Sequence, residues 1–468
     1  MNDVILEQSP IPGLLVVRVP VHADNRGWFK ENWQREKMTA VGVPDFGPVQ
    51  NNISFNQRRG ATRGLHAEPW DKLVSVATGR VFAAWVDLRE GPSFGATHHV
   101  EIDPSVTVFV PRGVANGYQA LEDATAYTYL VNEHWRPGLT YAALALDDPT
   151  AAVPWPIDLA EADISEKDRG NPRLEAASSV PTRRTLILGG HGQVGRAFAA
   201  EFPDAVSVDL DDLDLTDPAA LDAWPWQDYD VVLNAAGYTA VDAAESDEGR
   251  RVSWAANATA PARLAALAAE HRFTLVHIST DYVFDGTVES HPEDEPLSPL
   301  GVYAQSKAAA DVAVTACPRH YLLRSSWIVG EGKNFVRTMQ RLARDGVSPS
   351  VVHDQVGRLT FATEIARATR HLLETESPFG TYNVTNAGPP TSWAEIARAV
   401  FTLCGRAEDD VTPITTEEYA ASASVTPAPR PRHSVLDLTR LQATGFEPAD
   451  AAIELRRYLH PRDPDSGT

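Results

Sequence analysis

A tyrosine and a lysine, Tyr303 and Lys307, lie four residues apart in the segment PLGVYAQSKAAAD. In a helix this spacing places both side chains on one face. An ammonium beside a phenol lowers the pKa of the phenol, so the tyrosine can exchange a proton with a carbonyl oxygen near neutral pH. Thr280 ends the apolar segment TLVHIST, which we expect to be a strand. A lone motif of this kind also fits two surface residues at helical spacing.

A glycine-rich segment, RTLILGGHGQVGRAF, begins at Arg184. It fits G-x-G-x-x-G from Gly190 and G-x-x-G-x-x-G from Gly189. Such glycines let the backbone approach a pyrophosphate that rests on a helix N-terminus. Asp209 ends the next expected strand about 20 residues later, where a carboxylate can accept a hydrogen bond from an adenosine ribose. The segment predicts a dinucleotide site, with a glycine-rich turn in another α/β protein as the alternative.

A second set of reactive side chains lies near the N-terminus, in GATRGLHAEPWDKLVSV. Arg63, His66 and Lys72 fall on or beside successive expected strands. The spacing His66-x-Glu68, with Asn116 at the later position of a barrel-type metal pattern, supplies one imidazole and one carboxylate. Two such ligands make a poor metal site, so we predict no metal. A packed core histidine is the plain alternative for His66.

Two kinds of periodicity position these residues. Short, closely spaced apolar runs continue to about residue 155 and predict a β-sandwich or barrel. From residue 184 apolar strands alternate with Ala-rich helical segments, which predicts βαβ units and a parallel sheet. We therefore expect a β domain over residues 1–170, a linker over 171–183 (NPRLEAASSVPTR) and an α/β domain over 184–468.

Composition narrows the class of protein. The 468 residues carry a net charge of −22, which argues against a nucleic-acid-binding surface. The two cysteines, Cys317 and Cys404, lie far apart and fit a reducing compartment. The N-terminus has no basic segment before an apolar run, and no stretch approaches the roughly 18 apolar residues of a membrane helix. We expect a cytoplasmic protein without a membrane or nucleic-acid partner.

Residues from about 184 to 460 resemble the dTDP-4-dehydrorhamnose reductase family of extended short-chain dehydrogenases/reductases. The motifs that carry this resemblance include GGHGQVG, STDYVFDG, YAQSK and RPRHSVLD. The resemblance implies a Rossmann-type fold, a catalytic set of Thr280, Tyr303 and Lys307, and sugar contacts from Thr280, Asp281 and Trp327. It implies NADH or NADPH as cofactor, held by Gly189, Gly192, Gln193, Val194, Asp209, Asp214, Leu215, Gly237, Tyr238, Thr239, Tyr303 and Lys307.

Three departures from this family are small, and none removes a catalytic atom. Gly237 stands where Ala is usual, Leu359 where Pro is usual, and Asp311 where Glu is usual. Asp209 favours NADH, because its carboxylate repels a 2′-phosphate.

The first 170 or so residues are similar to the dTDP-4-dehydrorhamnose 3,5-epimerase family, a metal-free cupin with a jelly-roll fold. DNRGWFKE, RGLH, DDPTAAVPWP and ISEKD carry this resemblance. It implies His66 as general base oriented by Asp168, Lys72 as the group that stabilises an enolate oxygen, and Tyr129 as acid on the opposite face. The residues implied in substrate binding are Arg26, Glu31, Gln50, Asn52 and Arg63.

This half departs more from its family than the other half does. Asn116 replaces the usual His and Trp135 replaces a usual second Tyr. Proton transfer at one carbon is therefore expected, and whether both C3 and C5 are inverted is left open.

Together the two resemblances predict a bifunctional enzyme. Its β domain would epimerise dTDP-4-dehydro-6-deoxy-D-glucose, and its α/β domain would reduce the product at C4 to dTDP-L-rhamnose. One alternative is a monofunctional reductase whose cupin binds substrate without catalysis or with altered specificity. Another is a non-catalytic, nucleotide-binding regulatory protein, which would not need Thr280, Tyr303 and Lys307. Because cupins of this kind usually pair through β-strands, we expect a homodimer.

Overall fold

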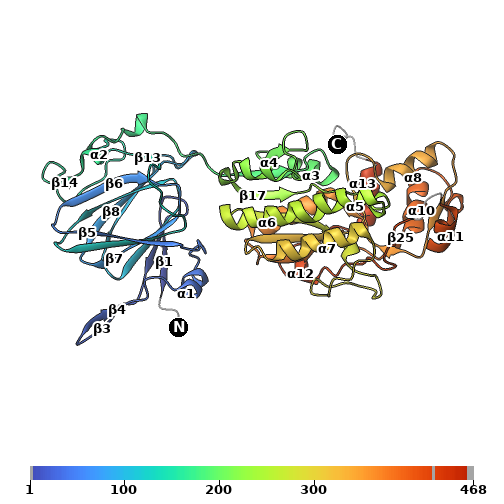
Figure 1. The fold of residues 1–468 in the computed structure, drawn as a ribbon, viewed down its shortest axis with the longest axis horizontal. Coiled ribbons are helices and arrows are strands. Elements are labelled where there is room, and N and C mark those ends of the chain that lie inside the picture. The colour runs from blue at the N-terminus through green and yellow to red at the C-terminus, as the bar shows by residue number, and fades with distance from the viewer. Residues whose placement is uncertain (1–3, 424–426, 461–468) are drawn as a thin grey trace, which may run out of the picture. The chain divides into compact units, whose positions relative to one another are not determined.

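The computed structural model describes residues 4–423 and 427–460. The chain divides into two units, Met1–Thr182 and Arg183–Thr468, which Figure 1 colours from blue to green and from green to red. Within the described ranges, no helix is long and apolar enough to cross a membrane.

The N-terminal unit consists of two antiparallel sheets that enclose one core. The first sheet has the order β1 (Ile5–Gln8), β2 (Leu15–Arg18), β10 (Val106–Val110), β7 (Lys72–Thr78), β12 (Thr125–Val131), β5 (Gln50–Asn56). The second has the order β13 (Ala142–Ala143), β6 (Ala61–Ala67), β11 (Val114–Ala120), β8 (Val81–Asp87), β9 (Thr97–Ile102), with β14 (Asp163–Ile164) parallel to β6. Val74 and Tyr127 from the first sheet pack with Trp85 and Tyr118 from the second. Burial of these side chains supplies the main stabilisation of the unit.

A short hairpin and two short helices complete this unit. The hairpin of β3 (His22–Asp24) and β4 (Gly27–Phe29) projects from the sheets (Figure 1) and exposes Trp28 and Phe29. Helix α1 (Arg35–Ala40) follows it, and α2 (Glu166–Arg169) follows β14.

The segment expected as a linker, 171–183, differs from that expectation. Leu174 is buried in the N-terminal unit, and its backbone N–H donates to the carboxylate of Asp148. The backbone of Val180 is bonded to Leu88 and Glu90 in strand-like fashion. The segment holds too few apolar residues to show a period, yet Leu174 and these backbone bonds hold most of it on the β unit.

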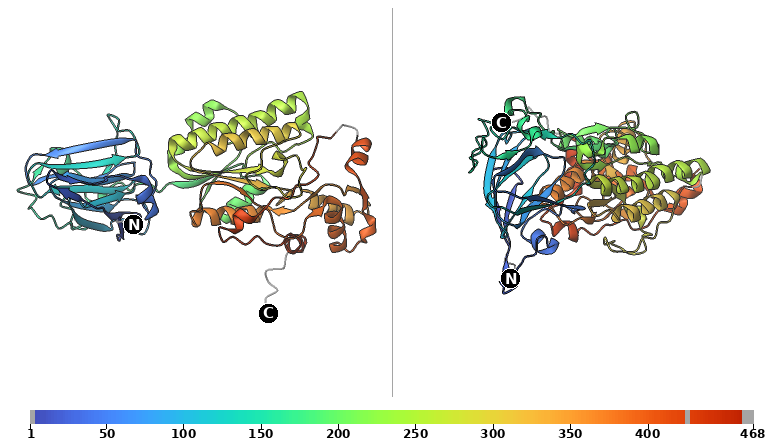
Figure 2. Two further views of the ribbon diagram at one scale, coloured as in Figure 1. Left: turned by 90° about the horizontal axis from the view of Figure 1, so that it is seen from below. Right: turned by 60° about the vertical axis from the view of Figure 1, so that its left-hand side comes forward.

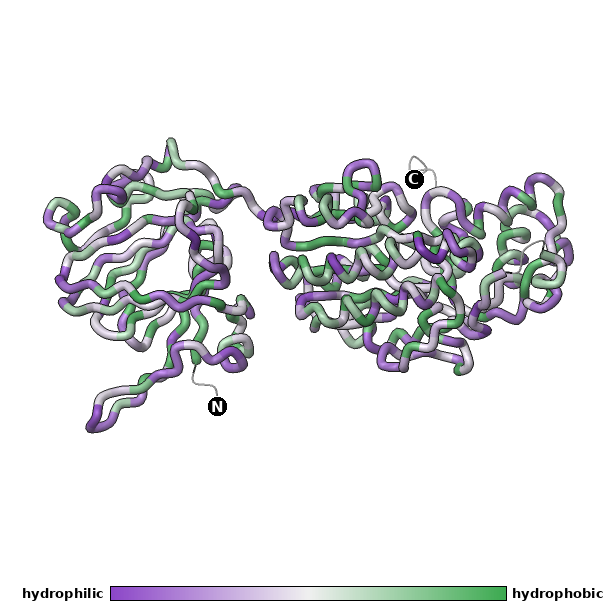
Figure 3. The backbone as a smooth tube through the Cα atoms, viewed as in Figure 1, coloured by the Kyte–Doolittle hydropathy of each residue, from purple (hydrophilic) through white to green (hydrophobic). Residues whose placement is uncertain are grey.

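The C-terminal unit is built on a parallel sheet. Its order is β16 (Val206–Val208), β15 (Arg184–Leu188), β17 (Tyr229–Asn234), β18 (Thr274–Thr280), β19 (His320–Ser325), β24 (Gly380–Asn383). Helices cover both faces (Figure 2, left): α3 (Gln193–Glu201) and α9 (Ala362–Glu374) on one, α6 (Ala260–His271) and α7 (Val302–Thr315) on the other. Figure 3 shows a hydrophobic segment along β17, where Val232 and Leu233 are fully buried.

The remaining helices lie in two groups, one packed around the sheet and one in a C-terminal lobe. Leu221 of α4 (Pro218–Ala223) packs in the core with Val208 of β16, while α5 (Asp247–Trp254) packs against α7 and continues through a π-helical turn, Ala255–Thr259, into α6. The C-terminal lobe holds α8 (Phe335–Arg344), α10 (Trp393–Leu403), α11 (Thr416–Ser422), α12 (Thr439–Gln442) and α13 (Ala451–Leu459). Its short strands are β20 (Ile328–Val329), β21 (Ser350–Val352), β22 (Val356–Gly357), β23 (Thr360–Phe361), β25 (Thr391–Ser392) and β26 (Thr412–Ile414).

Candidate functional sites

The glycine loop joins β15 to α3, and a Cβ at Gly189, Gly190 or Gly195 would collide with neighbouring atoms. Gly189 has φ +77°, in the left-handed region that favours glycine. A Cβ on Gly195 would lie 2.1 Å from the carbonyl oxygen of Gly189. Gly192 occupies the N-cap of α3 without a side-chain cap, so the first N–H groups of the helix are available to an anion.

A cavity of about 490 Å³ lies at the carboxyl ends of β15 and β17. In an open parallel sheet, ligands bind where neighbouring strands connect in opposite directions, and β15 with β16 on one side and β17 on the other forms such a point. Seven of the residues expected at the cofactor line the cavity: Gly189, Gly192, Asp209, Asp214, Leu215, Gly237 and Tyr238.

The other five expected cofactor residues lie outside this lining, and two of them, Tyr303 and Lys307, are on α7 (Val302–Thr315). Gln193 turns its side chain toward the C-terminal lobe, where Oε1 accepts the N–H of Gly330 at 2.7 Å. Val194 packs into the core under α3, and Thr239 is exposed beyond Tyr238.

Asp209 is fixed by the glycine loop itself. Its carboxylate oxygens accept the backbone N–H groups of His191 and Leu210 at 2.7 and 2.8 Å. Burial raises the pKa of Asp209, but these two bonds outweigh it, so the net shift is downward and the group is ionised. Carboxylate oxygens that each accept one hydrogen bond retain capacity for a ribose hydroxyl.

Thr280, Asp281 and Tyr303 meet beside the C-terminal end of β18. The Thr280 hydroxyl donates to Oδ1 of Asp281 at 2.8 Å. Oδ2 of Asp281 is buried, and no hydrogen-bond partner is found for it among the described residues. Burial raises the pKa of this carboxyl to about 6, although the side chain of Ser434 opposes the shift. An unpartnered buried carboxylate oxygen in a reactive site is suited to a hydroxyl of a bound ligand.

The expected lowering of the pKa of Tyr303 by Lys307 is not found. Burial dominates and, with the charge of Asp281, raises the pKa well above its ordinary value, although the Thr280 hydroxyl opposes the shift. The spacing of the two residues places them on one face of α7, but it does not indicate how deeply the site is buried from solvent. The phenol is consequently protonated at neutral pH, which suits a group that must donate a proton.

Lys307 is buried behind Tyr303. Its Nζ donates to the carbonyl of Ile278 at 2.6 Å and lies 3.3 Å from Nε2 of His277. Burial lowers the pKa of Lys307 to about 8, while the charge of Asp311 opposes that shift. Asp311 is itself bonded to Ser279 at 2.5 Å and to Arg324 at 2.9 Å.

The π-helical turn before α6 supplies a residue, Asn257, that no sequence motif singles out. Asn257 binds the backbone N–H and C=O of Tyr238 at 2.8 and 2.9 Å and contacts Ser306. Ser306 in turn donates to the carbonyl of Tyr303 at 2.7 Å. Asn257 therefore ties the cavity loop to the helix that carries Tyr303 and Lys307. An asparagine within an Ala-rich helical segment was the only available signal.

Trp327 lies in the C-terminal lobe with φ +47° and stacks on Trp393 at 3.9 Å. Gly357 packs against its indole, where a Cβ would come within 2.8 Å. These contacts fix the ring in a single position.

In the N-terminal unit, His66 on β6 and Asp168 on α2 form a direct pair. Nε2 of His66 lies 2.8 Å from Oδ1 of Asp168, and Oδ2 accepts the N–H of Gly64 at 3.4 Å. Ser165 caps α2 and accepts the N–H of Asp168, which sets the position of the carboxylate. Burial raises the pKa of Asp168, but its bonds, led by that of His66, outweigh this and the net shift is downward.

Lys72 and Tyr129 share a carboxylate neighbour that the sequence interpretation had assigned no role. Nζ of Lys72 is paired with Glu68, and both side chains are largely buried. Burial and then the charge of Glu68 raise the pKa of Tyr129 to about 12, so this phenol is also protonated. The signal for Glu68 was its place two residues after His66, which puts both side chains on one face of a strand.

The two unusual residues of this unit have different surroundings. Asn116 lies opposite His66 in the pairing of β11 with β6, and its Oδ1 accepts the Tyr127 hydroxyl at 3.2 Å. Trp135 is 55% exposed, and its backbone N–H donates to Gln50 at 3.2 Å. Asn116 therefore belongs to the interior of the unit, whereas the Trp135 ring lies in solvent.

The expected substrate residues of this unit fall into two groups. Gln50 and Asn52 are hydrogen-bonded to each other on β5 at 2.8 Å, and Arg63 lies on β6, the strand of His66. Arg26 is on the projecting hairpin, where it pairs with Asp24, and Glu31 pairs with Lys37 at 2.5 Å. Arg26 and Glu31 thus make their contacts away from His66 within one chain.

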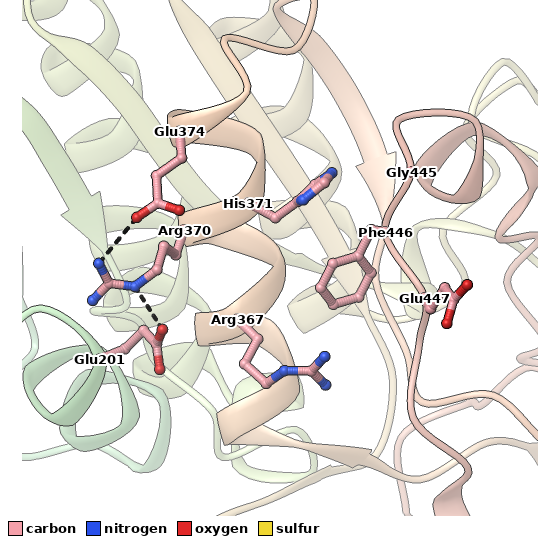
Figure 4. A pocket seen from close by; sticks show the side chains of 8 residues that line it. All are labelled: Glu201, Arg367, Arg370, His371, Glu374, Gly445, Phe446 and Glu447. Atoms are coloured by element: carbon pink, nitrogen blue, oxygen red, sulfur yellow. Dashed lines mark hydrogen bonds and ion pairs between the residues drawn. The ribbon is translucent and has the colours of Figure 1, made fainter.

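A second cavity, of about 400 Å³, lies between α3, α9 and the segment around Phe446 (Figure 4). Arg370 bridges Glu201 at 2.6 Å and Glu374 at 3.2 Å across its wall. None of the expected site residues lines it. Among the described residues, no group of three or more His, Cys, Asp or Glu side chains is arranged to hold a metal ion.

These features define a two-domain enzyme, with a hydrogen-bonded histidine–aspartate pair in a β unit and, in an α/β unit, a Tyr–Lys helix that Asn257 ties to the loop of a glycine-lined cavity. The family description "RmlD substrate binding domain" matches residues 183–462, and "dTDP-4-dehydrorhamnose 3,5-epimerase" matches residues 8–176. The chain therefore belongs to the RmlD family through its C-terminal unit and to the 3,5-epimerase family through its N-terminal unit.

Similar proteins divide in the same way. The chain is 51% identical over 175 residues to "Protein RmlC homolog" of Streptococcus pyogenes, covering 36% of this chain and 88% of that protein. It is 36% identical over 280 residues to the dTDP-4-dehydrorhamnose reductase of Mycobacterium tuberculosis, covering 57% of this chain and 89% of that protein. A solved dTDP-4-dehydrorhamnose reductase from Clostridium acetobutylicum is 34% identical with a TM-score of 0.54, covering 59% of this chain and 98% of that one.

Proposed function

We propose that this chain carries out two consecutive reactions of dTDP-L-rhamnose synthesis. The N-terminal unit epimerises dTDP-4-dehydro-6-deoxy-D-glucose, and the C-terminal unit reduces the resulting 4-ketone. The observation that carries the proposal is the presence of two sets on one chain: the His66–Asp168 pair, and the helix of Tyr303 and Lys307, which Asn257 ties to the loop of the 490 Å³ cavity. The family membership of both units supports the same pair of reactions.

In the first reaction His66 removes a proton from a carbon next to the C4 ketone. Asp168 orients the ring and stabilises the imidazolium that forms, because a buried carboxylate at 2.8 Å favours the charged ring. Lys72 stabilises the enolate oxygen once the substrate draws it from Glu68. Tyr129, held protonated, returns a proton on the opposite face.

In the second reaction the nicotinamide, when bound, supplies a hydride to C4. Tyr303 gives its proton to the developing alkoxide, which its raised pKa permits because the phenol is protonated at neutral pH. Thr280 shares this site and donates to Asp281. The unpartnered oxygen of Asp281 accepts a sugar hydroxyl and so orients the ring.

NADH or NADPH is the proposed cofactor, and the residues lining the cavity fit a dinucleotide. A dTDP-4-dehydrorhamnose reductase of Bacillus anthracis, 30% identical to this chain, was solved in complex with NADP. The ionised Asp209 at the end of β16 favours NADH, because a 2′-phosphate would meet its negative charge. For the fold we propose a cupin jelly roll followed by a Rossmann-type extended short-chain dehydrogenase/reductase.

We further propose a homodimer in the cytoplasm. Edge strand β5 exposes Ile53 and Phe55, and the projecting hairpin exposes Phe29. The family resemblance implies that Arg26 and Glu31 bind substrate. Within one chain both residues make their contacts on or just after the projecting hairpin. A second copy of the chain is therefore the simplest way to bring these two side chains to a substrate site.

The test supplies the purified full chain with dTDP-4-dehydro-6-deoxy-D-glucose and NADH or NADPH, and follows nicotinamide absorbance. The proposal expects oxidation of the cofactor without any added epimerase. Oxidation that appears only after a separate epimerase is added would leave a monofunctional reductase with a binding-only β unit, the outcome that Asn116 and Trp135 favour.

A further inference from the structure

A fully buried histidine, His277, has no role in the reactions proposed above. It lies on β18 in register with Asn234 on β17, and both side chains are buried on the face of the sheet that α7 covers. Its ring stands between Asn234, whose Nδ2 lies 3.0 Å from Nδ1, and Lys307, whose Nζ lies 3.3 Å from Nε2.

The protonation of this ring is fixed by the backbone of the cavity loop. The N–H of Ala236 donates to Oδ1 of Asn234 at 3.2 Å, which identifies that atom as the oxygen. Asn234 therefore turns its NH₂ group to Nδ1 of His277, and a ring nitrogen that accepts a hydrogen bond carries no proton. The single proton of the neutral ring is consequently on Nε2, the atom that faces Lys307.

An N–H group facing Lys307 discriminates between the two forms of the lysine. An ammonium has only donors, so Nε2–H cannot bond to it, whereas a neutral amine offers a lone pair. The other contact, to the carbonyl of Ile278 at 2.6 Å, is available to either form. Hydrogen bonds run from the N–H of Ala236 to Asn234 and from Asn234 to His277. The next hydrogen bond, from Nε2–H of His277 to Nζ of Lys307, can therefore form only when Lys307 is neutral.

We propose that His277 is a positioning residue that prepares Lys307 to release a proton during reduction. Tyr303 transfers its O–H proton to the alkoxide, and Lys307, four residues along the same face of α7, supplies from its ammonium the proton that restores the phenol. The resulting amine accepts a hydrogen bond from Nε2–H of His277, and solvent later returns a proton to Lys307. This inference rests on the proposed reductase function and assigns a residue that orders its proton supply.

The surrounding charges agree with this assignment. Burial, followed by the charge of Lys307, lowers the pKa of His277 well below its ordinary value, so the ring is neutral. Asp311 on α7 opposes the lowering of the Lys307 pKa, and Arg324 offsets much of its charge. The charged groups that other elements bring to α7 are Arg324 from β19, Asp281 from the turn Asp281–Val283 and Glu245 from the turn Ala243–Glu245.

The first test is ¹⁵N NMR of the histidine-labelled full chain without cofactor, since bare and protonated ring nitrogens differ strongly in chemical shift. We expect His277 to be neutral with its proton on Nε2 between about pH 6 and pH 9. A proton on Nδ1, or an imidazolium, overturns the proposal. Because no turnover is required, loss of the reductase function would leave this result interpretable.

The second test measures Lys307 directly, and the chain has only six lysines, so ¹³C-labelled lysine signals can be resolved. Asn234→Ala frees the ring to move its proton to Nδ1, so that Nε2 can accept from the ammonium. We expect the proton affinity of Lys307 to rise at least about threefold, a shift of half a pKa unit or more. His320→Gln, at a buried histidine bonded to Cys317, is the matched control and should leave Lys307 unchanged. An unchanged Lys307 in folded Asn234→Ala contradicts the proposal.

Discussion

Each of the two units holds a histidine whose ring is fixed by a neighbouring side chain, but the neighbours differ in kind. Nε2 of His66 faces the carboxylate of Asp168 at 2.8 Å, whereas Nδ1 of His277 faces the amide NH₂ of Asn234 at 3.0 Å. A carboxylate favours the charged ring, while an amide donor and a nearby ammonium both favour the neutral one. The same side chain is thus suited to a base in the β unit and to a fixed donor in the α/β unit.

The two sites also differ in how many of their expected residues the fold of one chain brings together. Around Lys307, contacts from β17, β18, β19 and α7 form one buried network. Around His66 the set is smaller, and two residues expected at the substrate lie on the projecting hairpin or just after it. The fold of one chain therefore assembles the α/β site, whereas the β site depends on further residues for its substrate contacts.

The largest expected effects come from one substitution in each unit. His66→Ala should slow hydrogen exchange at the sugar carbons about 10³-fold, because the general base is lost, and leave reduction of an already epimerised ketone unchanged. Tyr303→Phe should slow reduction by about the same factor and leave exchange unchanged. The measurements are deuterium incorporation and nicotinamide absorbance. Loss of both activities in either variant would show that the units are not separable catalysts.

A smaller effect is expected when the fixing group is changed. Asp168→Asn should lower exchange about 100-fold, because an amide cannot stabilise the imidazolium. The folded pKa of Asp168 is depressed, so its stabilising contribution is present above the unfolded pKa and is lost as pH falls through the folded value. The acid-side fall in melting temperature of the N-terminal unit should therefore be shallower in Asp168→Asn. An unchanged exchange rate would remove Asp168 from the account.

A tenfold effect is expected in the cofactor loop. Gly195→Ala places a methyl group 2.1 Å from the Gly189 carbonyl, so the loop must shift and NADH binding should weaken at least about tenfold. Calorimetric titration measures the affinity, and unchanged exchange at the β unit serves as the internal control. Wild-type affinity in this variant would mean that the loop does not hold the dinucleotide.

The smallest predicted effect concerns Glu68. Glu68→Gln removes a negative charge that, after burial, raises the pKa of Tyr129. The phenol should lose its proton at lower pH, so the alkaline limb of the exchange profile should move to lower pH, with about a threefold loss of rate on that limb. An alkaline limb that does not move would exclude Glu68 as an influence on the acid.

Local patterns predicted the positions of reactive groups better than their environments. The glycine loop and the spacing of Tyr303 and Lys307 are properties of short segments, so the sequence was sufficient to place them. The pKa of Tyr303 shifts opposite to expectation because burial arises from packing between distant elements. The pairing of Asn234 with His277 depends on strand order, and the packing of Leu174 depends on the β unit beneath it. These features have no signal within any short stretch of sequence.

The central claim is that one chain performs both proton exchange at the sugar ring and reduction at C4. The most direct measurement is to incubate the chain alone with dTDP-4-dehydro-6-deoxy-D-glucose and NADH or NADPH in D₂O and to determine deuterium in the reduced sugar by NMR. We expect dTDP-L-rhamnose carrying deuterium at both C3 and C5, with cofactor consumed in proportion. A reduced sugar that carries deuterium at neither C3 nor C5, or a failure to consume cofactor, would contradict the claim that one chain performs both reactions.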